Sequence, residues 1–208
     1  NWTYSDEQEA KLNYKGKDNP YISLPRMVLM TYQMPESLTQ IIEKGESSDY
    51  LNELISSNDD YYLCTLHRRE NINNFQSMWE QLNQISENKT IIYIKHPSVP
   101  NSEDFLGKNI IKLDPMTYQD MVFAINNSKG LISDSGGLQE EAICLNKNIL
   151  ICRDTSERPE TIDSGFGKLI GSDILNNIQF LENGNTKDIV ENPYGKNVVK
   201  KILEVLSD

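Results

Sequence analysis

Both histidines of this 208-residue chain, and four of its five arginines, lie in three short segments, while the rest of the chain is acidic. The segments are residues 65–71 (TLHRREN), 95–97 (KHP) and 153–160 (RDTSERPE). Guanidinium groups bind oxyanions through two parallel hydrogen bonds, and imidazoles donate to phosphates or act as acids. This concentration of basic groups predicts a pocket for a small anion.

A glycine turn between the second and third segments has the chemistry to complete such a pocket. Residues 133–141 (SDSGGLQEE) end an apolar run and begin a predicted helix. Gly136 and Gly137 let backbone N–H groups approach an anion closely, and the helix N-terminus adds partial positive charge. We expect the Ser135 hydroxyl to bind the same anion and Glu141 to reach sugar hydroxyls. Alternatively, Asp134 or Ser135 is an ordinary helix cap and the acids after it complement the helix dipole.

The first basic segment follows directly on a predicted strand. His67, Arg68 and Arg69 are candidates for contacts with a diphosphate, and His67 is also a candidate acid. A solvated loop in which Arg69 pairs with Glu70 is the structural alternative. The scarcity of arginine elsewhere in the chain favours the functional interpretation.

The other two segments also follow predicted strands. His96 is a candidate contact with the same ligand, although a lone histidine at a strand end is often structural. Arg153 and Arg158 flank two acids, just before Pro159 begins a helix. We expect them to form a wall or lid of the pocket; a salt-bridged loop is the alternative.

The bulk composition excludes several classes of partner. The net charge of −11 at pH 7 argues against nucleic acid, which needs a positive surface, and against anionic membranes. No apolar stretch approaches the roughly 20 residues that span a bilayer. Cys64, Cys144 and Cys152 lie singly in apolar runs without metal-ligand spacing. We therefore expect buried, reduced thiols and no bound metal in a cytoplasmic protein.

Hydrophobic periodicity indicates the elements that must position these residues. Continuous apolar runs alternate with amphipathic helical patterns, which predicts an α/β fold with a doubly wound parallel sheet of the Rossmann type. The expected strands are 61–66, 90–94, 110–113, 130–133, 149–152 and 168–170, and the expected helices are 35–44, 50–56, 75–85, 118–125, 138–145 and 198–206. We expect residues 1–60 to form an N-terminal tail and helical lead-in, with a short strand at 27–30, and residues 61–208 to form the Rossmann-like domain.

In this order, the segments resemble those of the non-hydrolysing UDP-N-acetylglucosamine 2-epimerase family. The matching stretches are 65–71, 96–97, 133–142, 153–160, 168–171 and 192–195. The pair formed by 134–142 (DSGGLQEEA) and 153–160 is highly specific. The resemblance covers roughly residues 61–205, which correspond to the second half of the family's architecture.

The resemblance implies a glycosyltransferase-B arrangement, in which two Rossmann-like domains face each other and the second holds UDP. Ser135 and Gly136 would bind the diphosphate, Glu141 the ribose hydroxyls, and His67 would lie near the diphosphate and the glycosidic bond. Arg68 and His96 match positions associated in bacterial members with a second, allosteric nucleotide-sugar molecule. The family reaction removes UDP by anti elimination across C1–C2 and re-adds it after C2 inverts, without a metal or redox cofactor. A cytoplasmic role in cell-wall polysaccharide biosynthesis is implied in the same way.

The family's first domain, which supplies the carboxylates that move the C2 proton, has no counterpart in these 208 residues. We therefore expect UDP or a UDP-N-acetylhexosamine as ligand, and isomerase activity only with a complementary first domain. A homodimer or a separate first-domain chain is the expected partner. Two alternatives stay open: a non-catalytic nucleotide-sugar-binding or regulatory subunit, and the nucleotide half of a split glycosyltransferase.

Overall fold

The computed structural model describes residues 34–45, 47–97, 99, 107 and 109–182. Six parallel strands form one sheet in the order β3-β2-β1-β4-β5-β6. The strands are β1 Tyr61–Thr65, β2 Thr90–Ile94, β3 Ile110–Leu113, β4 Gly130–Ser133, β5 Ile149–Ile151 and β6 Gly167–Leu169. This is the strand order of doubly wound nucleotide-binding folds, so the predicted fold class is confirmed.

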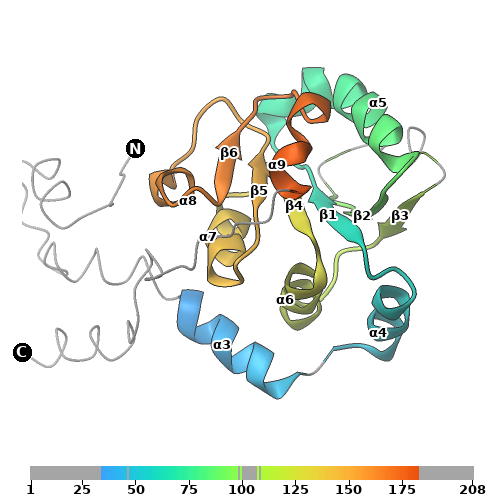
Figure 1. The fold of residues 1–208 in the computed structure, drawn as a ribbon, viewed down its shortest axis with the longest axis vertical. Helices are drawn as coiled ribbons and strands as arrows, with labels where there is room; N and C mark the ends of the chain where they lie inside the picture. The colour runs from blue at the N-terminus through green and yellow to red at the C-terminus, as the bar shows by residue number, and fades with distance from the viewer. Residues whose placement is uncertain (1–33, 46, 98, 100–106, 108, 183–208) are drawn as a thin grey trace, which may run out of the picture.

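Helices cover both faces of the sheet, and Figure 1 shows α5 and α9 on one side with α3, α4 and α6 on the other. The helices are α3 Met34–Lys44, α4 Asp49–Ser56, α5 Phe75–Ser86, α6 Tyr118–Asn127, α7 Gly136–Cys144, α8 Pro159–Asp163 and α9 Gln179–Glu182, with short 3₁₀ turns η1 Arg69–Asn74 and η3 Leu175–Asn177. The predicted elements between residues 35 and 170 therefore form, with ends displaced by one or two residues.

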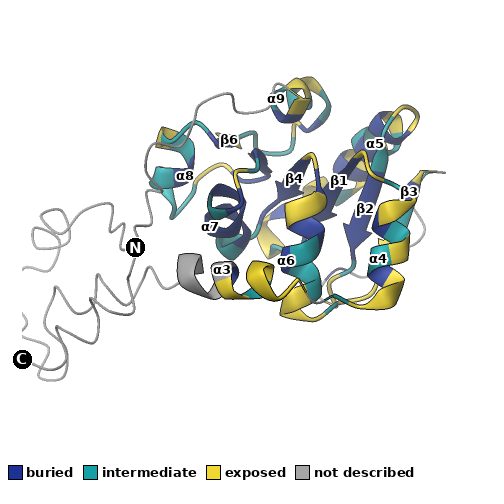
Figure 2. Cartoon of the chain, turned by 60° about the horizontal axis from the view of Figure 1, so that its bottom comes forward, coloured by how far each residue is buried: buried dark blue, intermediate teal, exposed yellow. Residues whose placement is uncertain are grey.

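Alternation along the strands divides the core into two layers. In β1, Leu63 packs with α3, α4, α6 and α7, whereas the next residue, Cys64, packs with α5 and α9. Both sides of the strands are thus buried, as their largely dark blue colour in Figure 2 shows. This burial on two faces explains why the strands read as continuous apolar runs rather than as alternating ones.

The described part of the predicted lead-in packs onto the sheet. Leu38 of α3 and Leu51 and Ile55 of α4 are buried in the same core layer as β1. Helix α3 ends at Lys44, and the next residue, Gly45, has a φ of +62°, a left-handed conformation that favours glycine. The expected strand at 27–30, the turn at 192–195 and the helix at 198–206 lie outside the described residues.

Two expectations about burial need correction. The helical stripe at 118, 121, 122 and 125 predicts that Tyr118 lies in the core or borders a base pocket, and the structure leaves it 42% exposed in the first turn of α6. Cys144 is only half-buried at the end of α7, whereas Cys64 and Cys152 are buried. No disulfide joins the three cysteines, each of which lies in the described part of the chain.

Candidate functional site

The strand order changes direction between β1 and β4, and the predicted site residues follow these two strands. Helices after β1 and after β4 leave on opposite faces, which opens a crevice where open α/β sheets bind ligands. Thr65 lies opposite Ser133 in the parallel register, so the residues that follow each strand meet at one edge. Ser133 also lies opposite Ile151 of β5. The first, glycine-turn and third basic segments therefore converge.

Asp134 joins the ends of three strands. Its buried carboxylate accepts hydrogen bonds from the backbone N–H of His67 (3.0 Å), the N–H of Arg68 (2.9 Å) and Nδ2 of Asn71 (2.9 Å). Asn71 also donates to the carbonyl of Cys152 at 2.9 Å. Burial acts to raise the pKa of Asp134, but the hydrogen bonds outweigh it and lower that pKa. The ionised carboxylate thus fixes the strand ends and does not act as an ordinary cap of α7.

The imidazole of His67 is oriented by the same carboxylate. Its Nδ1 lies 3.2 Å from Oδ1 of Asp134, which favours the tautomer with the proton on Nδ1 and turns Nε2 away from Asp134. The His67 ring stacks on that of His96, with ring centroids 4.6 Å apart. Partial desolvation of its ring, and then the charge of neighbouring His67, lower the pKa of His96. The two imidazoles form one platform at the ends of β1 and β2.

The first turn of α7 is open. Ser135 precedes the helix in extended conformation, and its side chain makes no capping hydrogen bond. A Cβ atom on Gly137 would meet nothing within 4 Å, and one on Gly136 would first meet Nη2 of Arg68 at 3.7 Å and then Oε2 of Glu157 at 4.0 Å. The first amides of a helix have no acceptor within it. An uncapped turn beside a guanidinium group suits an oxyanion.

Arg68 itself has unused donor capacity. Its Nε atom is buried and has no hydrogen-bond partner among the described residues. A buried donor without an acceptor destabilises the folded protein, so in native proteins such a group commonly donates to a water molecule or a ligand. Together with the open turn, this makes Arg68 the strongest anion-binding side chain that the sequence singled out.

Arg153 is held by carboxylates of the protein. Its Nε donates to Glu70 at 2.7 Å, and its two terminal nitrogens donate to Glu157 at 2.5 and 3.0 Å. These hydrogen bonds from Arg153 lower the pKa of Glu157 to about 2. The geometry is that of the salt-bridged loop, the alternative which the sequence also allowed. A direct role of Arg153 in ligand binding stays a prediction.

Arg158 is engaged in a similar way. Its Nε pairs with the buried carboxylate of Glu140 on α7, and Nη1 donates to the backbone carbonyl of Glu157 at 3.1 Å. Ser156 donates to Gln139 at 2.5 Å, so the loop before α8 is fastened to α7 at two points. Arg158 therefore stiffens the border of the crevice, and a contact with ligand stays a prediction.

The remaining predicted residues differ in setting. Arg69 is exposed at the start of η1, and His96 is exposed beside His67. Glu141 is buried on α7, where the hydroxyl of Tyr118 from α6 hydrogen-bonds its carboxyl group. Sequence reasoning treated Asp134 as a possible helix cap and missed its role in joining the strand ends. Its position directly after the end of β4 was the available signal.

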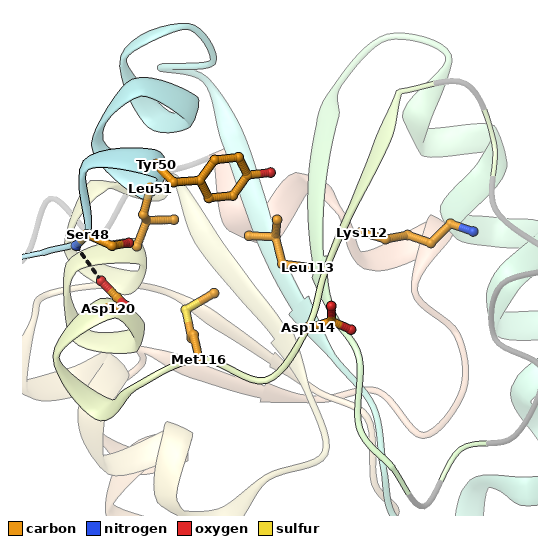
Figure 3. Close-up of a pocket in the computed structure, with 8 residues that line it drawn as sticks. All are labelled: Ser48, Tyr50, Leu51, Lys112, Leu113, Asp114, Met116 and Asp120. Atoms are coloured by element: carbon orange, nitrogen blue, oxygen red, sulfur yellow. Dashed lines mark hydrogen bonds between the residues drawn. The ribbon is translucent and has the colours of Figure 1, made fainter.

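Two cavities lie near the strand ends. One of ≈190 Å³ borders Arg153, and its lining residues are Glu70, Asn71, Asn74, Arg153, Asp154, Thr155, Gly171 and Ser172. The other, of ≈360 Å³, opens beyond β3, and Figure 3 shows its lining residues Ser48, Tyr50, Leu51, Lys112, Leu113, Asp114, Met116 and Asp120. In Figure 3 the Asp120 carboxylate accepts from the backbone N–H of Ser48. Its two aspartates make this second pocket a poor site for a phosphate.

No cluster of three or more His, Cys, Asp or Glu side chains among the described residues has the arrangement to hold a metal ion. No helix among these residues is long and apolar enough to cross a membrane.

The fold and the site define a class of protein: a Rossmann-like α/β domain of the glycosyltransferase-B type, with an open helix start at its switch point. A family model described as UDP-N-acetylglucosamine 2-epimerase matches residues 28–207. The UDP-N-acetylglucosamine 2-epimerase of Methanococcus maripaludis is 34% identical over 180 residues, which cover 79% of this chain and 49% of that protein. That of Escherichia coli is 32% identical over 197 residues, or 83% of this chain and 52% of the other.

Solved structures of UDP-GlcNAc 2-epimerases share the fold of this chain. The UDP-GlcNAc 2-epimerase of Methanocaldococcus jannaschii, in complex with UDP-GlcNAc and UDP, matches with a TM-score of 0.71 and 29% identity over 83% of this chain and 52% of the other. That of Neisseria meningitidis, bound to UDP-GlcNAc, matches with a TM-score of 0.61 and 28% identity over 82% and 52%. The chain belongs to the UDP-N-acetylglucosamine 2-epimerase family, as predicted. It spans about half the length of the curated relatives it matches.

Proposed function

We propose that this chain binds UDP or a UDP-N-acetylhexosamine at the switch point between β1 and β4. In this role it supplies the nucleotide half of an epimerase site that interconverts UDP-GlcNAc and UDP-ManNAc. The observation that carries the proposal is the open first turn of α7, flanked by Arg68 with its unpartnered Nε. The complexes of the relatives with UDP-GlcNAc and UDP support it.

Different residues contact the diphosphate, the ribose and the sugar–phosphate bond of the nucleotide. The amides of Gly136 and Gly137 and the Ser135 hydroxyl receive the diphosphate, and Arg68 adds a charge-assisted contact on its flank. Glu141 accepts hydrogen bonds from the ribose hydroxyls. His67, oriented by Asp134, directs Nε2 toward the bond between sugar and diphosphate. When the imidazole is doubly protonated, with its charge stabilised by the Asp134 carboxylate, its Nε2–H donates a proton to the oxygen of the departing diphosphate as the C1–O bond breaks.

Inversion at C2 also needs a group that removes and returns the C2 proton. The described carboxylates near the turn are already engaged in contacts within the chain. Asp134 accepts hydrogen bonds at the strand ends, Glu157 pairs with Arg153, and Glu140 pairs with Arg158. Glu141 is buried against Tyr118. We therefore assign the C2 acid–base chemistry to a complementary domain, in a partner chain or a second copy.

Exposed apolar side chains support such a partner. Tyr50, Ile72 and Tyr118 are 64%, 56% and 42% exposed. They stand at the start of α4, in η1 and at the start of α6, all close to the carboxyl ends of the strands. A first domain facing this edge would cover them. The three unbridged cysteines favour a cytoplasmic setting for the assembly.

The committed carboxylates also favour a second candidate function, a nucleotide-sugar-binding or regulatory subunit without catalysis. Both functions require UDP binding, and they differ in turnover beside a partner. Formation of UDP-ManNAc from UDP-GlcNAc in the presence of a first-domain chain supports the epimerase. Tight binding with no product beside any such chain supports the regulatory subunit.

Calorimetric titration with UDP tests the site. Arg68→Ala should weaken binding by about 10-fold or more, since a hydrogen bond to a charged group contributes about 1.5–3 kcal/mol. Lys129→Ala is the charge-matched control, because Lys129 is exposed at the opposite edge of the sheet, just before β4. Equal losses in both variants, or no binding of UDP by the unaltered chain at millimolar concentration, would contradict the proposal.

A further inference from the structure

Tyr118 of α6 and Glu141 of α7 form a side-chain pair near the proposed nucleotide site. Glu141 lies on α7 and is 6% exposed. Its Oε2 atom is buried and accepts no hydrogen bond from the described residues. The Tyr118 hydroxyl hydrogen-bonds this carboxyl group from the first turn of α6. A buried carboxyl group with an unused oxygen is destabilising unless another partner completes it.

The position of the pair fits the ribose of a bound nucleotide. Glu141 lies five residues after Gly136, about 7.5 Å along the helix from the proposed diphosphate site. Tyr118 follows the loop from β3 and so stands at the edge of the sheet where the site opens. Because Tyr118 is 42% exposed, its ring contributes less to the core than the buried residues of α6 do.

The charges around Glu141 oppose its ionisation. Burial, the largest cause, raises the pKa of Glu141 to about 7; the Tyr118 hydrogen bond acts in the opposite direction, and Glu140 raises the pKa further. Arg158 and Glu160 act on Glu140 in turn. Cys144 of α7 acts on Tyr118. The other titratable groups described on α6 and on the helices packed against α6 and α7 are Glu43 and Lys44 on α3, Asp49, Tyr50 and Glu53 on α4, Asp120 on α6, and Glu160 and Asp163 on α8. Tyr118 thus favours the charged form of Glu141.

We propose that Tyr118 is a positioning residue for the nucleotide: its hydroxyl holds the Glu141 carboxylate so that an oxygen accepts hydrogen bonds from the ribose hydroxyls of UDP. The inference rests on the proposed function and adds the residue that makes Glu141 a competent acceptor. Only an ionised carboxyl group offers all its oxygens as acceptors. UDP affinity should therefore increase as the pH rises through the titration of Glu141.

The test is a calorimetric titration of the unaltered chain and of Tyr118→Phe at pH 6, 7, 8 and 9. Tyr118→Phe keeps the ring and removes the hydroxyl, and Tyr50→Phe, at an exposed tyrosine on α4, is the control. UDP and 2′,3′-dideoxy-UDP are compared throughout. Their phosphates titrate alike, near pH 6, so the difference between them isolates the ribose contact.

For the unaltered chain we expect UDP to gain affinity between pH 6 and 8 relative to the dideoxy analogue. In Tyr118→Phe this gain should move to higher pH, with an affinity for UDP about 10-fold lower at pH 7 and nearly restored at pH 9. Tyr50→Phe should follow the unaltered chain. An equal loss at every pH, or an equal loss for the dideoxy analogue, would show a merely structural role and overturn the inference.

The failure of the inference can be told from that of the proposed function. If the unaltered chain binds UDP and Tyr118→Phe has the same pH profile, the inference alone is wrong. If the unaltered chain binds neither nucleotide, both are wrong. A thermal unfolding curve of Tyr118→Phe that matches the unaltered chain excludes misfolding as the cause of a loss.

Discussion

At the residue scale, Asp134 decides the geometry of the site. The positions of His67 and Arg68 depend on one buried carboxylate that accepts their backbone amides. A carboxylate has two oxygens for several donors, and an amide of the same shape has one. The site is therefore sensitive to a change of a single atom at this position.

We predict that Asp134→Asn lowers the free energy of unfolding by about 3 kcal/mol at pH 7, because its amide group would face donors. The pKa of Asp134 is lowered in the folded state, so its stabilisation is present above the ordinary aspartate pKa and is lost as the pH falls through the lowered value. The difference from the unaltered chain should shrink accordingly in acid. Urea unfolding measures it, with Asp114→Asn, at an exposed aspartate, as control.

Glu141 has the opposite linkage. Its pKa is raised from 4.5 to about 7 in the folded state, so the stabilisation present below pH 4.5 is lost as the pH rises to 7. Glu141→Gln should remove this loss and raise the free energy of unfolding at pH 8 by about 1–3 kcal/mol. UDP binding should weaken in the same variant. The free energy of unfolding of Glu141→Gln is compared with that of the unaltered chain at pH 4.5 and at pH 8. A difference that is no larger at pH 8 than at pH 4.5 would contradict the raised pKa of Glu141.

At the scale of elements, α7 combines a packed body with an open start. Its Ala142 and Ile143 are fully buried, whereas Gly137 in the first turn faces empty space. Nothing in the fold itself therefore requires glycine at position 137. A bound anion close to this turn would supply the requirement, because a side chain would occupy its place.

Two glycine substitutions separate these requirements. Gly137→Ala should leave the melting temperature unchanged or slightly raised, because alanine is the better helix former, while UDP affinity falls about 10-fold. Gly167→Ala should instead destabilise the fold by about 1–3 kcal/mol, because its Cβ would lie 2.5 Å from Cγ2 of Thr161. Thermal unfolding and calorimetry of both variants check this. If Gly137→Ala binds UDP as tightly as the unaltered chain does, the diphosphate does not bind at this turn.

The elements show what periodicity can predict. Strands such as Thr90–Ile94 are continuous apolar runs because both faces of the sheet are covered, and this signal lies within the sequence itself. The bond from His67 to Asp134 joins residues 67 positions apart. Their contact depends on β1 and β4 being neighbours, which periodicity does not encode. The stripe of α6 likewise left two possibilities for Tyr118, the core or the border of a pocket, because periodicity does not indicate which end of a helix extends beyond the core.

At the scale of the whole molecule, the chain spans about half of its relatives and carries one side of the proposed crevice. We predict that the isolated chain binds UDP but forms no UDP-ManNAc from UDP-GlcNAc, because Asp134, Glu140 and Glu157, the carboxylates near the turn, are held in other contacts. Nuclear magnetic resonance of the anomeric region detects the product. Adding a first-domain chain should produce it, and Ser135→Ala in this chain should then reduce the rate. Turnover by the isolated chain would refute the division of roles.

The internal pairing of the site's cations has a kinetic consequence. Glu70 and Glu157 already neutralise Arg153, and Glu140 neutralises Arg158, in a chain of net charge −11. A diphosphate that approaches from solution is therefore repelled by the net negative charge of the chain. It is attracted only at short range, where it contacts the site itself. Added salt shortens the range of that field, to about 10 Å at 0.1 M. Moderate ionic strength should consequently quicken the encounter of UDP with this chain, the reverse of the usual effect for an anion and its receptor.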